Sequence, residues 1–256
     1  DFNGYLQDIR VYKGVAKYTS NFTPVGTFTR NQFAVSPGTI DANGDAKATP
    51  FNPFNTDIST VRGQETGYAT WNPLSHSSGT LSEGNLSLVG SDASGGATRT
   101  NATLAVSSGK WYFEVLLQQA GTATDVGIAY NDITNNAPGV TNSGSGDYGY
   151  LLESGATYNN NSSSSYGSSL TTGDTFMCAF DVDTYKLYFG KNGIWFGSSN
   201  PVTGSNPAFN ITSGLSYRPT ARPWAGGSAN AKIQANFGQK PFKFAPPDGF
   251  QPLNTA

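Results

Sequence analysis

The sequence predicts an all-β chain folded as a sandwich of antiparallel β-sheets. Apolar and polar residues alternate over many short segments, which is typical of strands with one face in a core. The 31 glycines and 14 prolines supply turn points between these segments. Aromatic residues make up 13% of the chain and all hydrophobic residues only 36%, which favours a core of few, large side chains. No segment has a convincing helical periodicity.

The first 25 residues contain one predicted strand, at about residues 5–12, and then a stretch rich in lysine and tyrosine. The run D-F-N-G-Y-L-Q-D-I-R-V-Y-K-G-V-A-K-Y-T resembles the end of a LamG-like (concanavalin A-like) domain of phage and bacterial surface proteins. The resemblance implies that residues 1–25 are a terminal fragment of such a domain. Because one strand cannot bury a face alone, we expect it to dock on the following domain; pairing with another copy and disorder are the alternatives.

Residues 26–65 are rich in proline, glycine, asparagine and threonine, which predicts a linker. Within it, Asp41, Asn43 and Asp45 place oxygen ligands at alternate positions, as a calcium-binding loop begins. A calcium loop of that type needs glycine at the sixth position and glutamate at the twelfth, where this chain has Ala46 and Asn52. An ordinary turn is therefore the favoured interpretation, and calcium binding the alternative.

Short strands are predicted from residue 66 onward, which begins the main domain, residues 66–256. The strongest is residues 110–117, K-W-Y-F-E-V-L-L, in which every second side chain is apolar from Trp111 to Leu117. Residues 131–147 and 159–169 are polar segments that we expect to be loops, and the second, N-N-N-S-S-S-S-Y-G-S-S, to be mobile. The other strands expected in this part are residues 68–71, 84–89, 102–106, 126–130, 148–152 and 156–158, and Asn72-Pro73 predicts a turn after the first of them.

Residues 173–196 predict the start of a meander of three strands. Phe176, Cys178 and Phe180 alternate on one face of the first strand, and Leu187 and Phe189 repeat the inward pattern in the second. Lys186 and Tyr188 should then face outward. Asn192-Gly193 predicts a two-residue hairpin turn, because both residues tolerate the positive φ that such a turn requires. Residues 194–196 would start the third strand.

The C-terminal part is expected to add strands at residues 207–211, 215–220 and 232–237. A loop rich in proline and glycine is predicted around Trp224. The proline-rich tail, K-P-F-K-F-A-P-P-D-G-F-Q-P-L, should run extended over the outside of the domain.

The order of these segments resembles a SPRY domain. The matching segments are S-G-K-W-Y-F-E-V, V-G-I-A, G-Y-L-L, G-D-T-F-M-C-A-F-D-V-D-T-Y-K-L-Y-F-G-K-N-G, Y-R-P and N-F-G-Q-K-P-F, in that order. The resemblance implies a bent antiparallel β-sandwich that binds proteins or peptides through loops at one edge, without catalysis. It also implies a peptide pocket lined by a tryptophan in the region of Trp224. Arg222 and Pro223 stand where the family usually has small apolar residues, so the pocket would differ in shape or be absent.

Six residues are candidate ligand-binding positions. Trp224 lies where strand periodicity does not demand an inward aromatic, although it could equally anchor its loop to the core. Arg218 and Arg222 bracket Pro219 and could bind a carboxylate, with a surface ion pair as the alternative. Three tyrosines beside polar loops resemble the makeup of recognition loops, with a solvated loop as the alternative. These are Tyr148, Tyr158 and Tyr166.

Catalysis, metal binding and cofactor binding find no support in the sequence. His76 is the single histidine and has no nucleophile motif beside it. The glutamates lack the E-x-D-x-x-E spacing of glycanases built on a concanavalin A-like sandwich, and the single histidine and single cysteine exclude a His/Cys metal cluster. With a net charge of -2 and no stripe of lysine and arginine, nucleic-acid binding is not expected. No apolar run is long enough for a membrane span.

The sequence therefore predicts a non-catalytic recognition module for a protein, a peptide or a cell-surface ligand, within a phage fibre or another virion surface protein. A lectin-like module that binds surface glycans and a purely structural fibre or decoration segment are the alternatives. In the structural alternative, the strand at residues 5–12 would mediate self-association. The sequence does not identify a cellular compartment, and a virion or extracellular surface is favoured.

Overall fold

The computed structural model describes residues 67–76, 79–90, 99–130, 146–160, 162–224 and 230–255. All of them fall within one compact unit, Thr66–Ala256. The predicted strand at residues 5–12, the linker with its calcium alternative, and most of the polar loop at 131–147 lie outside the described residues.

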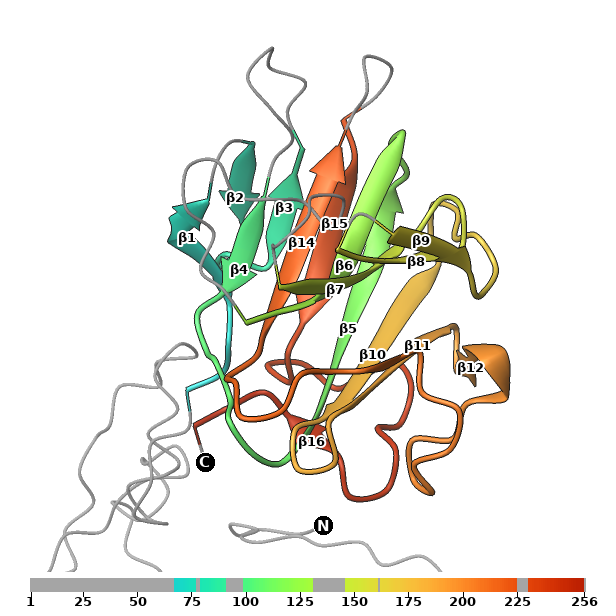
Figure 1. Ribbon diagram of the computed structural model, residues 1–256. Coiled ribbons are helices and arrows are strands. Elements are labelled where there is room, and N and C mark those ends of the chain that lie inside the picture. Colours follow the sequence, from blue (N-terminus) through green and yellow to red (C-terminus); the bar gives the residue numbers. More distant parts are fainter. Residues whose placement is uncertain are drawn as a thin grey trace, which may run out of the picture. The chain divides into compact units, whose positions relative to one another are not determined.

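Two antiparallel sheets form a β-sandwich, as the sequence predicts (Figure 1). The seven-stranded sheet has the order β1-β4-β14-β6-β7-β8-β9. Its strands are β1 (Trp71–His76), β4 (Thr100–Ala102), β6 (Ala123–Ala129), β7 (Asp147–Leu151), β8 (Ala156–Asn159), β9 (Ser162–Ser165) and β14 (Arg218–Trp224).

The nine-stranded sheet has the order β12-β11-β10-β5-β15-β3-β2, with β13 paired to β11 and β16 paired to β5. The pairing of β16 with β5 is parallel. The strands are β2 (Thr80–Ser82), β3 (Ser87–Val89), β5 (Lys110–Gln119), β10 (Thr175–Asp181), β11 (Lys186–Lys191), β12 (Ile194–Trp195), β13 (Phe209–Asn210), β15 (Lys232–Asn236) and β16 (Gln251–Pro252).

The predicted meander is confirmed. Strands β10 and β11 pair from Phe176↔Lys191 to Asp181↔Lys186. The second turn has the positive φ values expected of a tight hairpin, 48° at Asn192 and 88° at Gly193. Phe196 is the exception, because it begins a 3₁₀ turn, η3 (Phe196–Ser198), and does not continue the strand.

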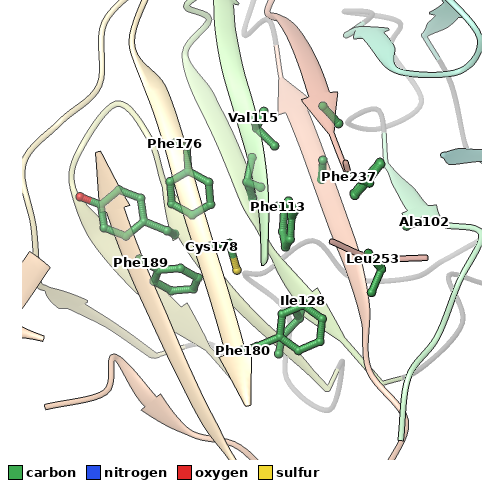
Figure 2. Close-up of a cluster of buried hydrophobic side chains, with 14 of the residues drawn as sticks. Ala102, Phe113, Val115, Ile128, Phe176, Cys178, Phe180, Phe189, Phe237 and Leu253 are labelled. Atoms are coloured by element: carbon green, nitrogen blue, oxygen red, sulfur yellow. The ribbon is translucent and has the colours of Figure 1, made fainter. Parts of the chain in front are cut away.

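The core lies between the inner faces of the two sheets (Figure 2). Phe113 and Val115 of β5 and Phe176, Cys178 and Phe180 of β10 are fully buried. From the opposite sheet, Tyr150 stacks on Phe176 with ring centroids 5.6 Å apart. Burial of such large apolar surfaces is the main favourable contribution to folding. The inward alternation of β15 is also as predicted, since Ile233, Ala235 and Phe237 are buried.

The outer face of the nine-stranded sheet differs from the expectation. Tyr188 faces away from the main core, as alternation predicts, yet it is only 1% exposed. Together with Tyr112, Met177 and Ala179 it packs against Phe250 of the C-terminal tail. Phe242 and Phe244 of the tail and Trp195 pack against the same cluster. Alternation predicted the face correctly, but the tail covers that face and makes it a second, smaller core.

Glu114 fastens the tail to this face. Its side chain is 3% exposed, and its carboxylate accepts hydrogen bonds from the backbone N–H groups of Lys243 at 2.9 Å and Phe244 at 2.8 Å. The hydroxyl of Tyr112 donates a third bond at 2.9 Å. Burial, followed by the charge of Glu114, raises the pKa of Tyr112, so this hydroxyl keeps its proton.

Replacing Glu114 with glutamine is expected to lower the free energy of unfolding by about 1–3 kcal/mol. The glutamine amide replaces one carboxylate oxygen with an NH₂ group. That group is a donor, so the backbone N–H that it faces loses its acceptor. Urea denaturation measures the change. Glu83→Gln, at an exposed position, is the matched control and should stay within about 0.5 kcal/mol of the parent. Equal effects of the two substitutions would contradict a role for Glu114 in holding the tail.

Three segments expected as loops or turns are strands. Residues 162–165 form β9, because backbone pairing with β8 does not require apolar side chains. The segment before and including Trp224 continues β14, with Pro219 and Pro223 inside the strand, paired to β6 along its whole length. The expected turn at Asn72-Pro73 lies within β1, where the register is irregular.

Candidate functional site

The outer face of β14 carries three of the six candidate residues. Side chains alternate along a strand, and Ala221 points into the core, so Arg218, Arg222 and Trp224 share the opposite face. They stand in register with Ala129, Asp125 and Ala123 of β6. We call this side of the seven-stranded sheet, away from the core, its outer face.

Trp224 is the last residue of β14 and is 39% exposed. Its backbone carbonyl accepts a hydrogen bond from the N–H of Thr122 at 3.1 Å. The structure therefore corrects the expected loop: a strand end, paired with Ala123, presents the indole.

The turn before β6 is shaped to receive this strand end. The carboxylate of Glu153 accepts the backbone N–H groups of Gly121 at 3.3 Å and Thr124 at 2.6 Å. A Cβ atom at position 121 would lie 2.4 Å from the carbonyl oxygen of Trp224, so only glycine permits this approach. Gly121 and Glu153 were not identified from the sequence. Their signals were a glycine just before a predicted strand and a single glutamate just after one.

Arg222 forms a buried ion pair with Asp125. Its Nε and Nη2 atoms both donate to Oδ2 of Asp125, whose side chain is fully buried, while Arg222 itself is 9% exposed. Burial raises the pKa of the Asp125 carboxyl, and the guanidinium of Arg222 opposes that rise. Asp125 was not identified as a site residue, although an acid directly before the apolar run V-G-I-A was a visible signal.

A second arginine lies near this pair. Burial, and then the charge of Arg222, lowers the pKa of Arg99, and the charges of Asp147 and Asp125 act in the opposite direction. On the neighbouring strand β4, Asn101 is in register with Thr220 of β14 and is fully buried. Its side-chain amide has no hydrogen-bond partner within the described ranges. The outer face of β4, β14 and β6 is thus a polar, charged layer.

The three candidate tyrosines are separated by the structure. Tyr158 of β8 is in register with Gly149 of β7, which in turn pairs with Gly127, so its half-buried ring belongs to the outer face. Tyr148 faces the core, is 8% exposed, and makes a hydrogen bond to Thr212 at 3.0 Å. Tyr166 packs edge-on against Phe196, and its hydroxyl bonds to Ser199 at 2.8 Å. The structure therefore brings Tyr158 to the face of Trp224 and leaves the other two elsewhere.

The described part of the chain contains no cluster of three or more metal-ligating side chains. His76 ends β1, and its Nδ1 atom is buried without a hydrogen-bond partner there. None of the helices in the described ranges has the length and apolar character needed to cross a bilayer.

Comparisons with protein-family models, with known sequences and with solved structures each find similar proteins. The model of the SPRY domain family matches residues 110–240. The E3 ubiquitin-protein ligase RKP of Arabidopsis thaliana is 32% identical over 166 residues, which cover 62% of this chain and 11% of that protein. The Ran-binding proteins 9/10 homolog of Drosophila melanogaster is 31% identical over 173 residues, 64% of this chain and 16% of that protein. The chain thus spans less than a fifth of these relatives.

Among solved structures, the crystal structure of the SPRY domain of human HERC1 superposes with a TM-score of 0.50 at 21% sequence identity. The match covers 64% of this chain and 96% of that domain. At this level of identity the likeness supports the fold alone.

Proposed function

The chain belongs to the SPRY domain family, and from this premise we propose that it recognises a protein or peptide at the Trp224 end of the outer face of its seven-stranded sheet. A SPRY domain is a non-catalytic interaction module, and one similar protein is named for binding Ran. The proposal assigns recognition to the strand end of β14 and supporting roles to its neighbours.

Exposure of Trp224 is the observation that carries the proposal. Four large hydrophobic side chains of the described residues are exposed, and Trp224 is the aromatic one; the others are Leu74, Ile194 and Val202. Tryptophan is enriched among the residues that contribute most to binding at protein interfaces. The strand, Thr122 and the turn held by Glu153 fix its backbone, so little order has to be gained on binding.

Each candidate residue has a distinct place in the proposal. Trp224 contacts the ligand. Arg218 and Tyr158, both half-buried, share its face but lie away from it, because Arg218 is at the opposite end of β14 and Tyr158 is on β8, with β6 and β7 in between. Arg222 acts through Asp125 by holding β14 against β6. Ligand contacts by Tyr148 and Tyr166 stay predictions, and their burial and hydrogen bonds favour structural roles.

Replacing Trp224 with alanine is expected to weaken peptide binding by about thirtyfold, the effect of losing about 2 kcal/mol at a central interface residue. Short peptides selected from a random display library on the parent protein are the probe, and fluorescence anisotropy measures their affinity. Ile194→Ala, at a side chain 72% exposed on the other sheet, is the matched control and should leave the affinity unchanged. Peptides that bind the Trp224 variant as tightly as the parent would refute the proposed surface.

Finer predictions from the sequence belong to the same proposal. Recognition within a phage fibre or other virion surface protein rests on the resemblance of residues 1–25 to a LamG-like end. Tail or capsid genes beside the coding gene would support that setting. The lectin-like alternative predicts hits on a glycan array that Trp224→Ala abolishes, and the structural alternative, including self-association, predicts no ligand at all.

A further inference from the structure

Among the strands of the described residues, β9 is the edge strand of the seven-stranded sheet at the end opposite β1. It consists of Ser162–Ser165, pairs with β8 on one side, and all four of its side chains are exposed. Figure 1 shows β9 beyond β8 at the margin of the sheet. An open edge presents unpaired backbone groups that can pair with another extended chain.

The pairing pattern shows which backbone groups face outward. In an antiparallel pair, residues that exchange hydrogen bonds alternate with residues that do not. The N–H of Tyr166 donates to the carbonyl of Gly155 at 3.2 Å, so this pair is of the bonded kind. Bonded pairs recur at every second position, so the backbone of Ser164 bonds to that of Thr157. Ser163 and Ser165 lie at the positions in between, and their N–H and C=O groups point away from β8.

Nothing in β9 protects this edge. Natural edge strands are usually blocked by charged side chains, by proline or by bulges, and residues 156–165 contain no charge and no proline. The other edges of the two sheets are less suited to pairing. Strand β1 contains Pro73 and an irregular register, β12 has two residues, and β2 has three and is followed by Glu83.

The outer face beside β9 supplies an apolar contact. Tyr158 is in register with Ser163, so its half-buried ring lies next to a side chain too small to cover it. Leu151 and Ala156, also half-buried, continue the same face inward from the edge. A second copy of β9 would bring only serine side chains to this position. An extended segment with an apolar residue there would bury the ring.

We propose that β9 is a second recognition site, separate from Trp224, which takes an extended segment of a partner protein as an added β-strand. Main-chain hydrogen bonds to Ser163 and Ser165 hold the segment, and an apolar side chain of the segment packs beside Ser163 against Tyr158. The small serine side chains of β9 do not distinguish one partner sequence from another. The site therefore selects segments that are extended and carry that one apolar residue.

The test is a comparison of the variant Ser163→Pro/Ser165→Pro with Ser163→Ala/Ser165→Ala. Proline removes the outward N–H groups and leaves the bonds to β8, whereas alanine removes only the hydroxyls. The probe is a set of short peptides selected from a random display library on the Trp224→Ala variant of the full chain. We expect the proline variant to weaken their binding at least about tenfold and the alanine variant to leave it unchanged.

Amide hydrogen exchange of the parent protein gives a second readout that does not depend on a variant. In the free protein, the N–H of Ser164 should exchange slowly and those of Ser163 and Ser165 fast, and bound peptide should protect the latter two. Absence of any peptide sensitive to the proline variant, or peptides that bind without protecting Ser163 and Ser165, would overturn the proposal. Neither result bears on the Trp224 surface, which the Trp224→Ala experiment tests separately.

Discussion

Replacement of Arg222 by methionine is expected to lower the free energy of unfolding by about 3–5 kcal/mol, the range for removing one partner of a buried ion pair. Asp125 would be left fully buried, with its negative charge no longer compensated by the guanidinium. The methionine side chain fills most of the vacated volume, so the loss of unfolding free energy comes mainly from removing the positive charge of Arg222. Urea denaturation monitored by tryptophan fluorescence measures it.

The double variant Asp125→Leu/Arg222→Met is the control for this interpretation. Removing both charges also removes the uncompensated one, so the double variant should recover a large part of the lost stability. Additive losses would contradict the ion pair as the cause. A variant of Arg222 that keeps its stability and loses peptide binding would contradict the assignment of Arg222 to a positioning role.

Replacement of Phe237 by alanine is expected to destabilise the fold by about 3–5 kcal/mol. The ring is fully buried, packs edge-on against Trp71 at a centroid distance of 5.1 Å, and lies 5.7 Å from the ring of Phe113. Its backbone carbonyl also accepts the N–H of Leu253 at 3.0 Å, next to the final strand. The cavity left behind cannot collapse easily, because rigid strands line it on both sides. Thermal and urea unfolding measure the change.

Val202→Ala is the matched control, since this side chain is 51% exposed. Its effect should stay within about 0.5 kcal/mol. If Phe237→Ala were equally mild, the region around β15 would not be a tightly packed core.

The central meander shows how far local sequence patterns reach. Phe176, Cys178 and Phe180 alternate with Met177 and Ala179, which face the other way, and the structure buries the first three in the main core. Asn192-Gly193 predicted its turn because few other residue pairs adopt two consecutive positive φ angles. The alternation and the turn both depend only on residues adjacent in the chain, so they can be predicted from the sequence alone.

The site was less accessible to such reasoning. Trp224 and the two arginines were identified, and a strand was expected as far as residue 220, yet the prolines and glycines around Trp224 predicted a loop where β14 continues through the sheet. Asp125, the partner of Arg222, lies 97 residues away in the chain. No pattern in one sequence links two such positions, because their contact exists only once β14 and β6 are paired.

The polar run at residues 162–165 illustrates the same limit. Four serines have no apolar side to bury, so they predict a loop, but the hairpin with β8 supplies hydrogen bonds that serine backbones make as well as any. The reverse holds for Tyr148, which lies beside a polar loop in the sequence and packs against Phe209 and Tyr217 in the structure.

The sequence by itself determined the all-β class, the faces of the long strands and the tightest turn, since alternation and backbone preference are properties of adjacent residues. Tertiary structure decided which outward faces stay open: the tail, which was expected on the outside, covers Tyr112 and Tyr188 in particular, Arg222 is buried in its ion pair with Asp125, and Trp224 and the side chains of β9 remain exposed. The physical reason is that burial depends on what packs above a side chain, and the segments that pack there come from distant parts of the chain.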